Sequence, residues 1–250
     1  KYIDRIMRLA SVIADVDVYA SLSKTAIEND YVKPMIAVDN KLIIKNGRHP
    51  VIEKILTDDG FVPNDTIVDD EMTHIITGPN MAGKSTYMRQ VALIVLMAHI
   101  GSYVPASFAS IPIIDGIYTR IGASDDLSMG QSTFMVEMSE VSNILKNATE
   151  KSLVILDEIG RGTSTYDGMS LAFAIVEYIA SNIKAKTLVS THYHELTSLE
   201  SRFDNIKNYC MLVDDATEIK FLKKNIPKGC FYLMEEIAEI ILNYQKNIYK

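Results

Sequence analysis

The sequence has only two cysteines, no long run of apolar residues and no excess of basic over acidic residues. Cys210 and Cys230 lack the spacing of metal ligands, and two thiols do not form a disulfide framework. We therefore expect reduced thiols in a cytoplasmic protein. The longest apolar run, residues 91–98, is far shorter than the roughly 20 residues that cross a membrane. Charged and apolar residues alternate in the first ten positions, so we expect neither a signal peptide nor a membrane partner.

The charge balance is acidic, with 25 lysine and arginine residues against 32 aspartate and glutamate residues. Proteins that bind duplex DNA by themselves usually carry a basic excess, because neutralising phosphates supplies most of the affinity. The net charge of −7 argues against this chain being the main DNA-contacting surface, although it leaves room for a local basic patch. The 48% hydrophobic content is typical of a globular protein with a real core.

Periodicity divides the chain into three stretches. Residues 1–30 repeat apolar side chains at helical spacing. Two short apolar runs, residues 35–38 and 42–44, predict a hairpin around a turn at Asp39 and Asn40. From residue 66 to residue 212 strands and helices alternate, which predicts an α/β domain with a mostly parallel sheet flanked by helices. The predicted strands are residues 73–77, 117–121, 153–156 and 187–190, and the predicted helices are residues 84–100, 133–148, 167–182 and 194–199.

The chain continues differently after this alternation. Residues 218–222 predict one more strand, and Pro227 and Gly229 then interrupt the pattern. The last segment predicts a helix whose apolar stripe is either a core face within the domain or a seam for a partner. The stripe consists of Met234, Ile237, Ile241, Tyr244 and Ile248.

The sharpest chemical signal is a glycine-rich phosphate-binding pattern at residues 78–85. It follows an apolar strand and opens a long apolar helix, which is the context that the G-x-x-x-x-G-K-[ST] motif requires. Glycines let backbone N–H groups turn toward phosphate oxygens, and the helix N-terminus adds positive potential. The alternative is an ordinary turn with an exposed lysine. The predicted nucleotide-binding residues are Gly78, Pro79, Asn80, Met81, Ala82, Gly83, Lys84, Ser85 and Thr86.

Within this loop two side chains have distinct predicted roles. The bound nucleotide would be ATP or ADP. The ammonium group of Lys84 would reach the β- and γ-phosphates of ATP and assist catalysis, and the hydroxyl of Ser85 would bind Mg²⁺. A second signal lies at residues 153–158, where a continuous apolar run ends in Asp157 and Glu158. Such a run suits a central parallel strand, and ligands bind at the carboxyl ends of these strands. We expect Asp157 to hold Mg²⁺ and Glu158 to orient or deprotonate the attacking water, although strands also often end in exposed acids.

Several longer motifs together resemble the ATPase end of the MutS family, which belongs to the ABC-type ATPases. The resemblance runs from about residue 1 to about residue 226 and rests on several segments in the family's order. They are residues 47–51, 77–90, 101–105, 132–138, 157–168 and 191–196. The resemblance implies a P-loop NTPase fold of the ABC-ATPase type, with an N-terminal connecting helix and a small antiparallel β element.

The resemblance also implies roles that the residues alone do not settle. Ser132 would contact the γ-phosphate of a second ATPase subunit's nucleotide, whereas the sequence alone favours a plain N-cap of the following helix. His192 would sense the γ-phosphate, and the alternative is a core or surface histidine. Phe61 and Val62 would pack on the adenine, although a lone phenylalanine is more often part of a core. Asp167 matches a subunit-contact position.

Three domains follow from this reading: a connecting helix at residues 1–30, the ATPase domain at residues 31–226 and a divergent C-terminal helix at residues 227–250. The last stretch departs from the family, which puts dimerisation through that element in doubt. The role of Arg48 and His49 stays open. The family's mismatch-reading and clamp domains have no counterpart in the sequence, so we expect contact with mismatched DNA through other domains.

The motifs predict ATP binding and hydrolysis. The resemblance further implies that this hydrolysis drives clamp movements on mismatched DNA, with composite sites between two subunits and contacts to downstream repair proteins. Two rivals remain. An ATPase of another ABC branch would carry a Ser-Gly-Gly signature, where this chain has Ser132, Thr133 and Phe134. The second rival is a module that binds nucleotide but does not hydrolyse it by itself. Hydrolysis measured against protein concentration separates this binding module from an enzyme that is assembled by dimerisation.

Overall fold

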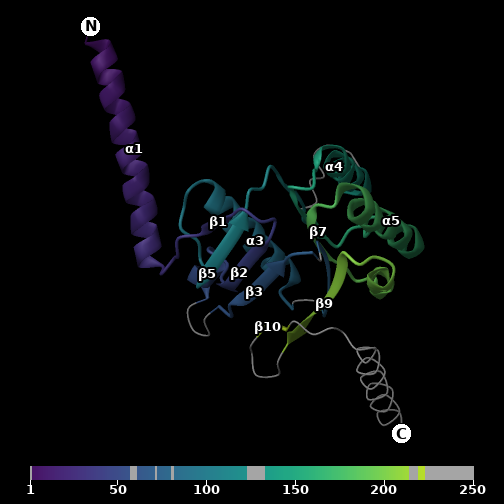
Figure 1. Ribbon diagram of the computed structural model, residues 1–250. Coiled ribbons are helices and arrows are strands. Elements are labelled where there is room, and N and C mark those ends of the chain that lie inside the picture. The colour runs from purple at the N-terminus through teal and green to yellow at the C-terminus, as the bar shows by residue number, and fades with distance from the viewer. Residues whose placement is uncertain are drawn as a thin grey trace.

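A computed structural model describes residues 2–56, 61–70, 72–79, 82–122, 133–213 and 219–222, and the structural statements below concern those residues. Two β-sheets form the body, with one helix between them and further helices outside the larger sheet (Figure 1). Helix α1 (Ile3–Glu28) projects from this body as a long rod (Figure 1). None of the described helices is long and apolar enough to cross a membrane.

The larger sheet confirms the predicted parallel architecture. Its strand order is β10-β9-β4-β8-β7-β6, and every neighbouring pair is parallel except β9 with β10. Strands β4, β7 and β8 are buried along their whole length, as the continuous apolar runs predict for strands covered on both faces. The strands are β4 (Thr73–Thr77), β6 (Ile117–Arg120), β7 (Leu153–Asp157), β8 (Lys186–Ser190), β9 (Ile206–Val213) and β10 (Ile219–Leu222).

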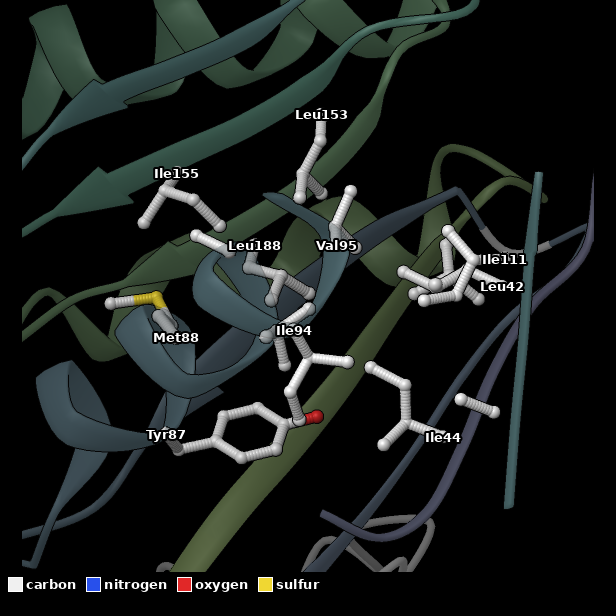
Figure 2. Close-up of a cluster of buried hydrophobic side chains, with 14 of the residues drawn as sticks. Leu42, Ile44, Tyr87, Met88, Ile94, Val95, Ile111, Leu153, Ile155 and Leu188 are labelled. Atoms are coloured by element: carbon white, nitrogen blue, oxygen red, sulfur yellow. The ribbon is translucent and has the colours of Figure 1, made fainter. Parts of the chain in front are cut away.

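Helix α3 (Lys84–His99) lies between the two sheets and contacts β2, β7 and β8. Its side chains are apolar around most of its circumference because both of its faces are covered. Figure 2 shows Ile94 of this helix between Leu188 of the large sheet and Ile44 of the small one, with Met88 on the side of the large sheet and Tyr87 below Ile94. This core therefore fixes the two sheets to each other.

A second core covers the opposite face of the large sheet. It is built by α4 (Thr133–Asn147), α5 (Thr165–Tyr178), a π-helical turn η2 (Ile179–Ile183) and a 3₁₀ helix η3 (His194–Ser201). The predicted helix at residues 167–182 thus ends as an α-helix at Tyr178, and the chain continues as the wider π turn. The predicted C-terminal helix lies outside the described residues.

The smaller sheet corrects the hairpin prediction. Its order is β1-β5-β2-β3, so β5 (Phe108–Pro112) separates β1 (Met35–Ala37) from β2 (Leu42–Gly47). Strand β2 is antiparallel to β5 and to β3 (Asn64–Val68), whereas β1 pairs with β5 in parallel. The hairpin prediction was wrong because Asp39 and Asn40 lack the glycine that tight two-residue turns favour, and because β5 comes from a distant part of the sequence.

Arg48 joins the long helix α1 to this sheet, which gives a role to a residue that the sequence left unassigned. Its guanidinium donates to the carbonyl of Asn29 (2.8 Å) at the end of α1 and pairs with Glu53 (2.6 Å) on the short helix α2 (Ile52–Ile55). Tyr31 donates to the same carboxylate (3.0 Å), and burial together with Glu53 raises the pKa of Tyr31 to about 12. The end of α1 is therefore anchored to the body, although most of α1 is exposed.

His49 has a local structural role beside Arg48. Its Nδ1 accepts the N–H groups of Val51 and Ile52, both at 3.3 Å, at the start of α2. Burial lowers the pKa of His49, which favours the neutral ring that this acceptor role requires.

Candidate active site

Most of the predicted site residues that the structure describes meet at the carboxyl edge of the large sheet. Strands β4, β8 and β7 end side by side, because Ile76 pairs with Ser190 and Ser190 pairs with Asp157. The loop at residues 78–83 follows β4, and the segment that begins with Glu158 follows β7. Neighbouring carboxyl ends of parallel strands form the crevice in which ligands of open α/β sheets bind.

Gly78 makes the first turn of the loop possible. Its φ angle is +139°, and a Cβ atom at this position would lie 2.8 Å from the carbonyl oxygen of Met211 on β9. A side chain here would therefore meet the backbone of the neighbouring strand. Gly83 leaves the loop in a left-handed conformation directly before α3. Asn80 and Met81 lie outside the described residues.

Lys84 is buried inside its own loop. Its side-chain ammonium donates to the carbonyl oxygens of Gly78 (2.8 Å) and Pro79 (2.9 Å). Burial lowers the pKa of Lys84, and the charges of Glu158 and Asp157 act in the opposite direction. The ammonium thus lies among loop carbonyls on the side of the two acids, where it would also meet an anion held by the loop.

The N-terminus of α3 carries no side-chain cap and no acidic residue in its first turn. Helix α5, by contrast, begins with Ser164, whose hydroxyl accepts the N–H of Asp167 at 3.4 Å. The first N–H groups of a helix need partners, and an uncapped N-terminus offers them to an anion. Ser85 and Thr86 lie in this first turn and are partly exposed.

Asp157 is buried at the end of β7 and accepts a hydrogen bond from the hydroxyl of Ser190. A carboxylate and the hydroxyl of Ser85 are hard oxygen donors of the kind that Mg²⁺ prefers. Among the residues that the structure describes, no group of three or more His, Cys, Asp and Glu side chains gathers at one point. This sparse donor set fits Mg²⁺, which usually takes one or two protein ligands and completes its shell with water and phosphate.

Glu158 adopts a left-handed backbone conformation with a φ of +54°. Its N–H donates to the carbonyl of Ser190 at 3.1 Å, and its carboxylate contacts the ring of His192 and pairs with Arg161 at 2.5 Å. Non-glycine residues with positive φ are uncommon, and such strain is frequent at functional sites. Two of the three predicted catalytic side chains, Glu158 and His192, are therefore in direct contact, and Lys84 is the third.

A hollow of about 190 Å³ opens beside this pair. It is lined on one side by the segment after β7 and on the other by the segment after β8, with both Glu158 and His192 in its wall. The lining residues are Glu158, Ile159, Arg161, Thr163, Thr165, His192 and Tyr193. The hollow places the acid, the histidine and an exposed arginine around one small volume.

The remaining predicted residues lie elsewhere or cannot be placed. Phe61 and Val62 lie just before β3 and are half-buried, and the carbonyl of Val62 accepts the amide of Asn64 at 3.0 Å. Asp167 accepts a hydrogen bond from Ser164 (2.6 Å) in the cap of α5. Ser132 lies outside the described residues. The predictions that Phe61 packs on adenine and that Ser132 contacts phosphate stay predictions.

Sequence reasoning missed two residues of this site, Ser190 and Arg161. Ser190 is the last residue of a predicted strand beside the one that ends in Asp157, and this position was the available signal. Arg161 follows Glu158 by three residues, a spacing that brings the two side chains together only if the intervening chain turns. The pattern of the sequence does not show that turn.

Known proteins with similar sequences indicate the family of this chain. The family description MutS domain V matches residues 74–238, about two thirds of the chain. The DNA mismatch repair protein MutS of Clostridioides difficile (strain 630) is 65% identical over 232 residues, which are 92% of this chain and 24% of that protein. The DNA mismatch repair protein MutS of Acetivibrio thermocellus is 60% identical over 232 residues, which are 92% of this chain and 27% of that protein.

This chain belongs to the MutS family. The MutS domain V match begins within β4 and includes the glycine-rich loop after β4, Asp157, Glu158 and His192. The five parallel strands and flanking helices form the mixed α/β fold of P-loop ATPases. The chain spans about a quarter of the length of the MutS relatives that it matches.

Proposed function

We propose that this chain is a Mg²⁺-dependent ATPase unit of a MutS protein. The observation that carries the proposal is the buried ammonium group of Lys84, held by the loop between β4 and α3 on the same sheet edge as Asp157 and Glu158. Phosphoryl transfer depends mainly on positioning and charge stabilisation, and this edge supplies a cation, backbone donors and two acids.

Each side chain has a defined task in this proposal. Lys84 and the first N–H groups of α3 bind the phosphates of ATP or ADP, and Ser85 and Asp157 hold Mg²⁺. The metal ion, when bound, neutralises charge that develops on the phosphate oxygens. Glu158 orients the attacking water and accepts its proton, and His192, in contact with that carboxylate, fixes its direction.

The rest of the proposed function comes from the relatives. Those proteins are named for DNA mismatch repair, and this chain corresponds to about a quarter of their length. We propose that nucleotide binding here changes the conformation of the other parts of such a protein, which would contact mismatched DNA and downstream repair proteins. A second ATPase subunit would complete the site, with Ser132 as its donor to the γ-phosphate.

One observation favours binding without turnover when the chain is alone. The carboxylate of Glu158 is engaged by both His192 and Arg161, so neither of its oxygens is free of a basic partner. A water molecule that is to give its proton to this carboxylate would therefore first have to displace one of these two side chains. A second subunit would then be needed to draw Arg161 away from Glu158.

The experiment is ATP hydrolysis with Mg²⁺, measured over a hundredfold range of protein concentration. Turnover that rises faster than linearly indicates that two chains assemble an active site. ATP binding without turnover at any concentration supports the nucleotide-binding module. Absence of both binding and turnover contradicts the proposed function, provided that the folded state is verified by circular dichroism in the same samples.

A further inference from the structure

A buried acid on α4 takes no part in the proposed chemistry but contacts the segment that carries it. Glu137 is only 3% exposed, and its Oε1 accepts the backbone N–H of Gly160 at 2.6 Å. Gly160 lies two residues after Glu158. Burying a carboxylate is costly unless hydrogen bonds and charges compensate, so this contact is a specific feature and not a chance approach.

The compensating charge comes from Arg120 at the end of β6. Its guanidinium lies 3.7 Å from Oε2 of Glu137 and 3.2 Å from Oε2 of Glu140, one turn further along α4. Arg120 and Glu137 are both buried, whereas the side chain of Glu140 is half exposed. One oxygen of Glu137 therefore faces the arginine, while the other accepts the Gly160 amide.

The peptide of Gly160 is held from its other side as well. Its carbonyl accepts the hydroxyl of Tyr193 at 3.0 Å, and Tyr193 directly follows His192, which contacts Glu158. Burial and the charge of Glu137 both raise the pKa of Tyr193, so its hydroxyl keeps the proton that it donates. The result is a closed chain of contacts from Glu158 through His192 and Tyr193 to Gly160.

A second contact ties the same segment to the first turn of α4. A Cβ atom at Gly162 would lie 3.0 Å from the Cα atom of Phe134. A side chain at residue 162 would therefore require Phe134 to shift by a few tenths of an ångström. The segment at residues 158–162 thus touches α4 at its backbone through Gly162 and at a buried side chain through Glu137.

We propose that Glu137 is a positioning residue that makes the first turn of α4 and the segment at residues 158–162 move as one unit. The inference rests on the proposed function, in which Glu158 faces the nucleotide of this chain and the start of α4 faces the site of a second subunit. Under that proposal, a nucleotide bound beside Glu158 alters the position of the first turn of α4 through the Gly160 peptide. The second subunit's site, which this turn faces, then responds to the change in position.

The first experiment measures amide hydrogen exchange at Gly160 in the 250-residue chain without nucleotide. In Glu137→Asp the charge beside Arg120 is kept, but the shorter side chain no longer reaches Gly160, so exchange at Gly160 accelerates at least about tenfold. In Glu137→Gln the charge is lost but an oxygen acceptor remains, so exchange stays within about threefold of the unaltered chain. Glu140→Gln, which removes a carboxylate beside the same arginine, is the matched control and leaves Gly160 unchanged.

The pair of variants separates positioning from charge balance and from misfolding. If Glu137 only neutralised Arg120, Glu137→Gln would lower the thermal midpoint and Glu137→Asp would leave Gly160 exchange unchanged, which overturns the proposal. Melting curves of all variants are recorded in the same buffer as a check on folding. Faster exchange at Gly160 counts as support only where the amides of β7 and β8 exchange at unaltered rates.

The second experiment adds Mg²⁺ and an ATP analogue with a non-hydrolysable β–γ bridge. In the unaltered chain, binding slows exchange in the first turn of α4, residues 134–138. Glu137→Asp binds the analogue with similar affinity but loses most of this slowing, whereas equal slowing in both chains overturns the coupling. If the unaltered chain fails to bind the analogue, the proposed function is overturned, and so is the coupling between the nucleotide site and α4. The measurement at Gly160 without nucleotide still decides whether Glu137 positions that peptide.

Discussion

Two lysines are buried at opposite ends of the same parallel sheet, and the difference between them shows what identifies a site. Lys84 follows the carboxyl end of β4 and is 5% exposed, whereas Lys186 begins β8 at the amino end of the sheet and is fully buried. Burial lowers the pKa of both, for Lys186 to about 8. By burial and pKa alone, Lys186 is the more perturbed of the two.

Their surroundings differ in chemistry. The ammonium of Lys84 donates to two carbonyls of a glycine-rich loop, and the charges of Glu158 and Asp157 support its protonated state. The ammonium of Lys186 donates to the side chain of Asn40, in the connection between β1 and β2, and senses the charge of Asp69. Lys186 therefore ties the large sheet to the small one.

A lysine with a lowered pKa therefore indicates a functional site only together with its backbone context. Around Lys84 the chain provides an uncapped helix N-terminus and a strained acid with φ of +54°. Those features suit a phosphate that arrives with its own charge. At the amino end of the sheet, Lys186 makes a structural bond between layers, and we expect no nucleotide there.

The largest effect is expected from exchanging each lysine for an apolar side chain of similar length. Lys84→Met should weaken ATP binding by more than about 100-fold, because a charge-assisted contact to phosphate is lost and a buried apolar group replaces it. Lys186→Met is the matched control and should leave ATP affinity within about threefold. Titration with a fluorescent ATP analogue measures both, and similar losses in the two variants would contradict the distinction drawn between the two ends of the sheet.

A second prediction separates binding from turnover at the carboxyl edge. Glu158→Gln should bind ATP normally and hydrolyse it at least about 100-fold more slowly, because an amide cannot accept the proton of the attacking water. Glu195→Gln, which removes an exposed acid shortly after His192, is the control and should hydrolyse at the rate of the unaltered chain. Unchanged turnover in Glu158→Gln would move the role of base to another group, with His192 the next candidate.

The large sheet was predictable from the sequence because its central strands are continuous apolar runs with helices between them. Strand β4 was predicted at its observed bounds, and β7 and β8 within one residue. Strands β3, β5 and β9 were missed. Their residues alternate between buried and exposed or include polar side chains, and their pairing with distant strands, which no local pattern encodes, decides their structure.

Of the candidate site, the sequence predicted the residues that line up with strand ends and the glycine-rich loop. It did not predict that Glu158 would contact both His192 and Arg161, or that Glu137 would reach Gly160. These contacts join segments that are up to 34 residues apart in the chain, and they depend on a left-handed turn at Glu158. Spacing along the sequence carries no information on such a turn when the residue is not glycine.

The smallest predicted effect is a pH dependence of the free energy of unfolding, caused by Lys186 at the amino end of the sheet. The ordinary pKa of a lysine is 10.5, and burial lowers that of Lys186 to about 8 in the folded chain. Between pH 8 and pH 10.5 the unfolded chain therefore holds this proton and the folded chain does not. Because the unfolded state binds more protons in this window, the free energy of unfolding rises with pH.

The gain attributable to Lys186 between pH 7.5 and pH 9.5 is at most about 2 kcal/mol. Other groups titrate over the same range, so the quantity to compare is the slope of the unaltered chain against that of Lys186→Met, measured by urea unfolding at several pH values. The variant lacks the titrating group, so its free energy of unfolding should rise less with pH. The side chain of Asn40 is exposed and can accept a hydrogen bond from water in place of the lost ammonium. Equal slopes in the two chains would show that the ammonium of Lys186 is solvated in the folded state, and the contrast with Lys84 would then rest on the loop alone.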